Sequence, residues 1–145
     1  MTDDLPSGAS ADAFPPPDGS VTHLVVVSDL ASSRAWYRDV LGAEETGAYE
    51  GSVVFRVLGS WMLVVEGGGP TADKPGTTFA PPADPDTVST ELIFGVPDCL
   101  AAYEALNARG AVFLTPPVTY AWEIRAFFRD PDGHLLEISE ARSGV

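Results

Sequence analysis

The sequence predicts an α+β fold made of two consecutive βαβββ units, because one pattern repeats at an offset of about 70 residues. In each half a Val-x-Asp step, "VSD" at 27–29 and "VPD" at 96–98, joins a strand-like segment to a helix-like one. In each half a Phe-Arg pair, at 55–56 and again at 128–129, comes before a hairpin turn. The order of one strand, one helix and then several strands therefore occurs twice.

The first unit begins with "SVTHLVVV" (20–27), whose β-branched residues predict a buried strand. In "SDLASSRAWYRDVLG" (28–42), Asp29 can cap a helix and Gly42 can end it. The segment "SVVFRVLGSWMLVVE" (52–66) predicts two strands that meet near Gly59.

The second unit repeats these elements. "STELIFGV" (89–96) predicts a strand, and "PDCLAAYEALNARG" (97–110) predicts a helix. "AWEIRAFF" (121–128) and "HLLEISE" (134–140) predict a second hairpin, because residues 130–133 are Asp-Pro-Asp-Gly, which favours a turn throughout.

The remaining segments set the predicted organisation. Residues 1–19 contain four Asp and no Lys or Arg, which predicts a disordered acidic N-terminal tail. We expect a single domain over 20–145, with module one at 20–66 and module two at 87–142. The Gly- and Pro-rich connection at 67–86 is long enough to be a functional loop or a linker.

Composition narrows the class of protein. The formal net charge of −13 argues against nucleic-acid binding, which depends on Lys and Arg, and against binding to anionic membranes. No apolar run is long enough to span a bilayer, and the N-terminus has no signal-peptide pattern. With Cys99 as the single cysteine no internal disulfide can form, which fits a cytoplasmic location.

Three segments resemble the vicinal oxygen chelate superfamily of glyoxalases, bleomycin-resistance proteins, fosfomycin-resistance enzymes and extradiol dioxygenases. They are "HLVVVSDLASSRAWYRDVLGAE" (23–44), "FFRDPDGHLLEISE" (127–140) and, more weakly, "ELIFGVPDCLAAYEALNARGAVF" (91–113). The resemblance implies paired βαβββ modules whose mixed sheets curl into a glyoxalase-like cup. It also implies a small-molecule ligand and a homodimer, because a second subunit often completes the cup.

The resemblance further implies a divalent metal, Mn, Fe, Ni, Zn or Mg, bound on the first and fourth strands of each module. Glu137 matches the last-strand carboxylate, and Glu91 matches the first-strand position of module two. In module one the corresponding position is Thr22, and His23 follows one residue later, so either could occupy it. The expected metal ligands are His23, Glu91 and Glu137, and the expected catalytic carboxylates are Glu137 and Glu66, with Glu66 as a general base or rim ligand.

Strand alternation predicts which side chains share the cup with Glu137. If the turn pairs Phe128 with Leu135, then Phe128 and Trp122 lie on the face of Glu137, whereas Arg125 lies on the opposite face and stays unassigned. The expected ligand-binding aromatic residues are Trp122, Phe128, Phe55 and Phe79.

Three functions fit these features. The first is a metal-dependent isomerase, lyase or dioxygenase that acts on a small metabolite chelated through vicinal oxygens. The second is a metal-free, bleomycin-resistance-like protein that binds an antibiotic or another planar or cationic molecule in an acidic, aromatic groove. The third is a structural or regulatory domain that keeps only the fold.

Overall fold

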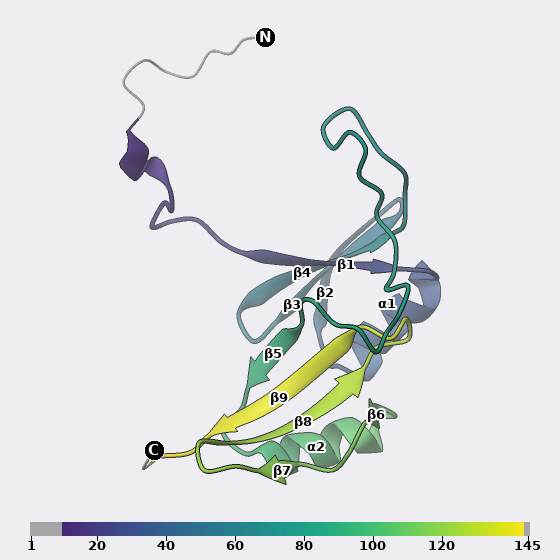
Figure 1. Ribbon diagram of the computed structural model, residues 1–145. Helices are drawn as coiled ribbons and strands as arrows, with labels where there is room; N and C mark the ends of the chain where they lie inside the picture. Colours follow the sequence, from purple (N-terminus) through teal and green to yellow (C-terminus); the bar gives the residue numbers. More distant parts are fainter. Residues whose placement is uncertain (1–9, 144–145) are drawn as a thin grey trace.

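The computed structural model describes residues 10–143 and contains two sheets and two α-helices (Figure 1). The first half of the chain forms β1 (Thr22–Val27), α1 (Leu30–Asp39), β2 (Glu44–Tyr49), β3 (Ser52–Val57) and β4 (Ser60–Glu66). The second half forms β5 (Leu92–Gly95), α2 (Cys99–Ala108), β6 (Val112–Phe113), β7 (Val118–Thr119), β8 (Glu123–Arg129) and β9 (Leu135–Ala141). None of the helices in this described part is long and apolar enough to cross a membrane.

The two sheets have the same strand order, which confirms the predicted α+β fold and its internal repeat. The first sheet runs β1-β4-β3-β2 and the second runs β5-β9-β8-β6, with β7 paired to β8. In each sheet the first strand is parallel to the last strand of its module, and the other neighbours are antiparallel. The sheets are therefore mixed, and neither closes into a barrel.

Both helices begin and end where the sequence predicts. The Asp29 side chain accepts a hydrogen bond from the Ser32 amide at 3.3 Å, and the Asp98 side chain accepts one from the Ala101 amide at 3.0 Å. Each aspartate thus satisfies an amide that the first helical turn leaves without a partner. Gly42 then follows α1 and Gly110 follows α2, both at positive φ, where glycine ends a helix with little strain.

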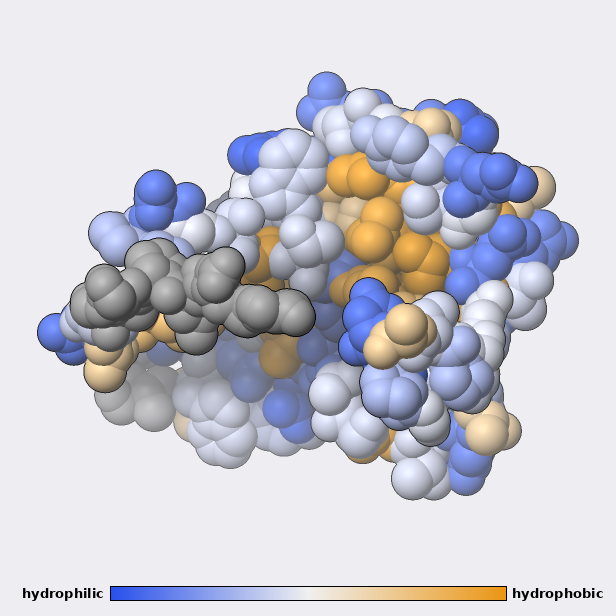
Figure 2. Space-filling model, turned by 90° about the horizontal axis from the view of Figure 1, so that it is seen from above, coloured by the Kyte–Doolittle hydropathy of each residue, from blue (hydrophilic) through white to orange (hydrophobic). Residues whose placement is uncertain are grey.

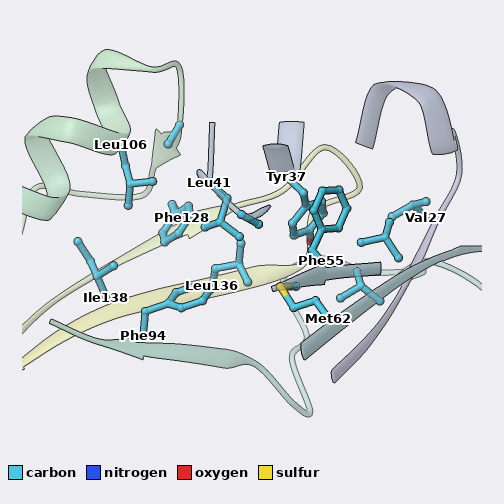
Figure 3. Packing of buried hydrophobic residues seen from close by; sticks show 14 of the residues in the cluster. Val27, Tyr37, Leu41, Phe55, Met62, Phe94, Leu106, Phe128, Leu136 and Ile138 are labelled. Carbon is cyan, nitrogen blue, oxygen red and sulfur yellow. The ribbon is translucent and has the colours of Figure 1, made fainter. Parts of the chain in front are cut away.

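One hydrophobic core serves both modules. Figure 3 shows Tyr37, Phe55 and Met62 from the first half close to Phe128 and Leu136 from the second. These five side chains are at most 2% exposed. The two units therefore share a single packed interior, and each sheet turns one face toward it.

The β8–β9 turn ties the second module to the first. The buried Tyr37 hydroxyl on α1 donates to Asp130 Oδ2 at 2.8 Å. The Asp132 carboxylate accepts from the Ser28 amide at 3.1 Å, and a ring nitrogen of His134 lies 2.7 Å from the Val26 carbonyl oxygen. The Asp-Pro-Asp-Gly turn thus binds β1 and α1 in addition to reversing the chain.

The flanking segments protrude from this body. Residues 67–86 extend beyond β4 (Figure 1), with a bridge between Gly68 and Phe79 and another between Thr71 and Lys74. Of the predicted tail, 1–9 lie outside the described residues, and 10–19 are exposed and contain a short 3₁₀ helix, Ala11–Ala13. Viewed from above, the surface is mostly hydrophilic, with hydrophobic side chains gathered in one recessed area (Figure 2).

Candidate functional site

The register of the second hairpin differs by one residue from the predicted one. Phe128 lies opposite Leu136, and Phe127 lies opposite Glu137. The turn is closed by hydrogen bonds from the Asp130 amide to the His134 carbonyl and from the Gly133 amide to the Asp130 carbonyl. Strand pairing therefore continues to the last residue of β8, and the pairing of Phe128 with Leu135 was wrong.

This shift changes which side chains accompany Glu137. Leu136 and Ile138 face the core, as alternation predicts, and Glu137 faces the other way. We call the surface that carries Glu137 the open face of the second sheet. Helix α2 packs against the other face of β8 and β9, and Ile93, which lies on the open face, is 54% exposed. The open face is made by Ile93, Glu123, Arg125, Phe127, Leu135, Glu137 and Ser139, with Glu91 at its end.

Two predicted ligand-binding aromatic residues are not available to a ligand. Phe55 and Phe128 are each 0% exposed and belong to the core, so their assignment was wrong. The reason is register: Phe55 lies opposite Met62, and Phe128 opposite Leu136, in the two layers that face inward.

The other two aromatic residues are accessible to different degrees. Trp122 immediately precedes β8, is 53% exposed and stacks on Tyr120 with ring centroids 5.5 Å apart. Phe79 is half-buried within the protruding loop, where Lys74 Nζ lies 4.6 Å from its ring centroid. Trp122 thus lies next to the strand that carries Arg125 and Phe127, whereas Phe79 is held by its own loop.

His23 and Glu66 do not lie with Glu137 as expected. His23 lies opposite Met62 and shares the inward face of Val25, and burial, followed by the charge of His134, lowers its pKa. Glu66 shares the face of Met62 at the exposed end of β4, so its predicted place in the cup was wrong. A one-residue step along a strand reverses the face, and no bulge corrects it in β1.

The repeat identifies the equivalent positions in the two modules. Thr22 precedes the residue paired with Met62, just as Glu91 precedes the residue paired with Leu136. By the same registers Leu63 is the counterpart of Glu137. Module two therefore has carboxylates at both positions, whereas module one has a hydroxyl and an aliphatic side chain.

A hard divalent metal needs several oxygen or nitrogen donors that converge. Across residues 10–143, no three His, Cys, Asp or Glu side chains are grouped to hold a metal ion. The donor set of Glu91 and Glu137 alone does not fit the three-ligand site that His23 was expected to complete. The chemistry of this site has to be derived from the carboxylates themselves.

Glu137 is the most perturbed group on the open face. It is only 4% exposed, and burial raises the pKa of its carboxyl from 4.5 to about 7. Hydrogen bonding to Glu91 and the charges of Glu91 and Glu123 raise this pKa as well, whereas Arg125 lowers it. Glu91 Oε2 is buried, and no N–H or hydroxyl group of the described residues donates a hydrogen bond to it. Glu137 can therefore take up or release a proton near neutral pH.

Residues that the sequence reasoning missed surround this pair. Ser139 Oγ donates to Glu123 Oε1 at 2.9 Å, and Arg125 Nη1 lies 3.6 Å from Glu123 Oε2. The Arg125 guanidinium also lies over the ring of Tyr120, at 4.8 Å from its centroid. The signal that could have found them is the turn length: extending the predicted strand by one residue puts Glu123 and Arg125 on the face of Glu137.

The comparisons with known proteins agree with this architecture. The family model for the Glyoxalase/Bleomycin resistance protein/Dioxygenase superfamily matches residues 20–138, so the chain belongs to that superfamily. A glyoxalase/bleomycin resistance protein/dioxygenase structure from Nocardioides is 22% identical, with a TM-score of 0.71, over 88% of this chain and 85% of that one.

Two further structures have the same fold. Lactoylglutathione lyase from Agrobacterium tumefaciens is 20% identical, with a TM-score of 0.65, over 86% of this chain and 95% of that one. The fosfomycin resistance protein FosX from Listeria monocytogenes is 19% identical, with a TM-score of 0.62, over 86% and 94%. No curated protein sequence matches the chain. At these identities the likeness establishes the fold, and the activity has to be argued from the site.

Proposed function

We propose that this protein is an isomerase or lyase that moves a proton on a small oxygenated metabolite bound to the open face of the second sheet. Glu137 is the acid–base group, and Glu91 is its partner. The observation that carries this proposal is the burial of the Glu137 carboxyl, which is 4% exposed, beside the carboxyl of Glu91; this arrangement raises the pKa of Glu137 to about 7. General acid–base catalysis is most efficient when the pKa of the group lies near the working pH.

The two carboxyls have different roles: Glu91 disfavours ionisation of Glu137, and Glu137 transfers the proton. Burial and the neighbouring Glu91 disfavour ionisation of Glu137, so at pH 7 about half of the Glu137 carboxyls carry a proton and half are ionised. In the ionised form, Glu137 accepts a proton from a carbon of the substrate. In an isomerisation it returns that proton to another atom of the same molecule. In a lyase reaction the bond from the neighbouring carbon to the leaving group breaks, and the leaving group takes the proton. Protons balance over the cycle, and no oxidant or reductant is required.

A second function is favoured by the exposed aromatic pair. Trp122 stacks on Tyr120 beside the open face, which is a suitable surface for a planar ligand. The alternative is therefore a small-molecule-binding protein of the bleomycin-resistance type that binds such a ligand without turnover.

Several expectations from the sequence remain part of the proposal. We place the protein in the cytoplasm because its one cysteine is a buried free thiol. We also propose a homodimer, on the basis of family membership, in which a second copy would cover the open face.

Deuterium exchange tests the proposed chemistry. In D₂O, the wild-type protein is expected to accelerate loss of the methyl proton NMR signals of pyruvate and hydroxyacetone, with a rate that changes around pH 7. Glu137→Gln should abolish the acceleration, because the amide cannot accept a proton, whereas Glu66→Gln should leave it unchanged. Carbon-13 NMR of labelled glutamate carboxyls should give a Glu137 pKa near 7.

Other results would decide against this proposal. A Glu137 pKa near 4.5, or equal exchange in wild type and Glu137→Gln, would rule out the acid–base role. Stoichiometric divalent metal in the purified protein, lost in both Glu137→Ala and His23→Ala, would instead support the metal centre predicted from the sequence. Binding of planar ligands that is accompanied by no exchange would support the binding protein.

A further inference from the structure

Arg125 differs from most other arginines of the described chain in the hydrogen bonds that its side chain donates. Five arginines donate hydrogen bonds to carboxylate or carbonyl oxygens, namely Arg34, Arg38, Arg109, Arg129 and Arg142. Within residues 10–143, Arg125 donates none, and its ion pair with Glu123 is 3.6 Å long. A charge-assisted hydrogen bond between such groups is about 2.7–2.9 Å long. The N–H groups of Arg125 can therefore donate hydrogen bonds to a ligand.

Two aromatic rings hold this guanidinium in place. Its central carbon lies 4.8 Å from the centroid of Tyr120 and 5.4 Å from that of Phe127. The Arg125 side chain is 33% exposed, so part of it faces solvent. Contact with the rings restricts the side chain without occupying its donors, which lowers the entropic cost of binding an anion.

The sheet places this cation next to the acid–base group. Arg125 lies opposite Ser139, and Glu137 lies opposite Phe127, so Arg125 and Glu137 are diagonal neighbours on one face. Diagonal neighbours in a sheet are about 7–8 Å apart, within reach of long side chains. A small acid can span this distance, with its carboxylate at one residue and a nearby carbon at the other.

We infer that Arg125 determines the substrate class of this site, and that the substrate is a small organic acid. Its carboxylate binds the planar fork of the Arg125 guanidinium, which matches two carboxylate oxygens. Glu137 then exchanges a proton at a carbon one or two bonds from that carboxylate. This assignment of the substrate rests on the acid–base role proposed for Glu137.

Binding of two matched probes tests the inference. Benzoylformate carries a planar ring and a carboxylate, and benzoylformamide has nearly the same shape without the charge. We expect wild type to bind benzoylformate at least about 10-fold more tightly than the amide, with a shift of the Arg125 Nε–H NMR signal. Arg125→Gln should remove this preference while keeping the affinity for the amide.

Arg56→Gln is the matched control. Arg56 also lies over an aromatic ring, with its central carbon 4.5 Å from the centroid of Trp61, but it belongs to the first sheet. This variant should keep the full preference for benzoylformate. Equal affinity of wild type for the two probes, an unmoved Arg125 signal, or an unchanged preference in Arg125→Gln would overturn the inference.

The design separates this inference from the proposed chemistry. Benzoylformate has no exchangeable proton next to its carbonyl, so its binding is measured without the exchange reaction, and the comparison with Arg125→Gln isolates the contribution of Arg125. If Glu137 fails the exchange and titration tests but Arg125 still selects the carboxylate, only the acid–base role is lost. If exchange depends on Glu137 but the probes bind equally, only the substrate class is wrong.

Discussion

Glu137 is buried on the opposite face of β9 from its two neighbours in the sequence. Leu136 and Ile138 are both 2% exposed and belong to the core, whereas Glu137 is 4% exposed on the opposite face. A buried carboxyl is costly to ionise unless it is paired with a cation. Here its partner is another acid, Glu91, so the cost appears as a raised pKa.

The raised pKa of Glu137 predicts how the free energy of unfolding changes with pH. A carboxyl whose pKa rises from 4.5 to about 7 on folding favours the folded state fully below pH 4.5, and that contribution is lost as the pH rises through 7. Glu137→Gln carries no charge, so it should be more stable than wild type at pH 8, by about 1–3 kcal/mol. The difference should shrink toward zero near pH 4.5.

Urea unfolding between pH 4.5 and pH 8 measures this difference. The control is Glu44→Gln, at an exposed position of β2. Its free energy of unfolding should differ from that of wild type by the same amount at every pH. A constant difference between Glu137→Gln and wild type over the whole range would mean that Glu137 ionises as freely in the folded chain as in the unfolded one.

At the scale of elements, the turn between β8 and β9 determines what lies on the open face. Gly133 has a φ of +87°, and a Cβ at that position would lie 2.9 Å from Pro85. Arg129 reinforces the same contact, because it donates to the Pro85 carbonyl at 2.7 Å and to the Gly133 carbonyl at 2.9 Å. The turn is thus fixed both by its own backbone and by the end of the long loop.

Gly133→Ala is therefore expected to destabilise the protein more than an alanine at another glycine of positive φ. At Gly76, which has a φ of +73°, an added Cβ would meet no atom of the described residues within 4 Å, so Gly76→Ala introduces backbone strain alone. Gly133→Ala adds a steric clash, which should cost about 1–3 kcal/mol more. Equal losses of unfolding free energy in the two variants would show that Pro85 simply moves aside.

The elements were more predictable from the sequence than the site. The caps Asp29 and Asp98 act through local hydrogen bonds, and local patterns are what a sequence displays directly. The prediction of which β8 side chains face Glu137 depended on the length of the turn. An error of one residue in that length assigns every β8 side chain to the opposite face. Arg125 was thereby placed on the wrong side, and Phe128 was mistaken for a ligand-binding residue.

The same limit applies to the partners of Glu137. Its own face was predictable from Leu136 and Ile138 on either side. Whether Thr22 or His23 matches Glu91 depends on how β1 pairs with β4, which is a long-range property of the sheet. The raised pKa also could not be predicted, because it comes from burial and from Glu91 rather than from the local sequence.

At the scale of the whole molecule, the modules are joined by packing and by several hydrogen bonds, of which the bond between Tyr37 and Asp130 is buried. Tyr37, from the first module, is 0% exposed and donates to Asp130, which is 5% exposed. Burial raises the pKa of Asp130, whereas its hydrogen bond to Tyr37 lowers it. The hydroxyl therefore stabilises a carboxylate that the shared core would otherwise leave poorly solvated.

Tyr37→Phe should destabilise the protein by about 1–3 kcal/mol, because it leaves this buried acceptor short of a donor. The matched control is Tyr103→Phe: Tyr103 packs edge-on against Phe113, and its hydroxyl makes no hydrogen bond among the described residues. Chemical denaturation of both variants provides the comparison. A loss for Tyr37→Phe as small as that for Tyr103→Phe would mean that the hydroxyl contributes little to holding the modules together.

The shared core has a consequence for how such a chain can evolve. In a polypeptide of one module, the part of the core that contacts the other module would stay uncovered unless the chain paired with a copy of itself. Both copies would then present the same outer residues. Joining two modules in one chain removes that symmetry. Thr22 and Leu63 can then diverge from Glu91 and Glu137 while the interior stays intact. Fusion thus allows one sheet to specialise while the other is released from the same selection.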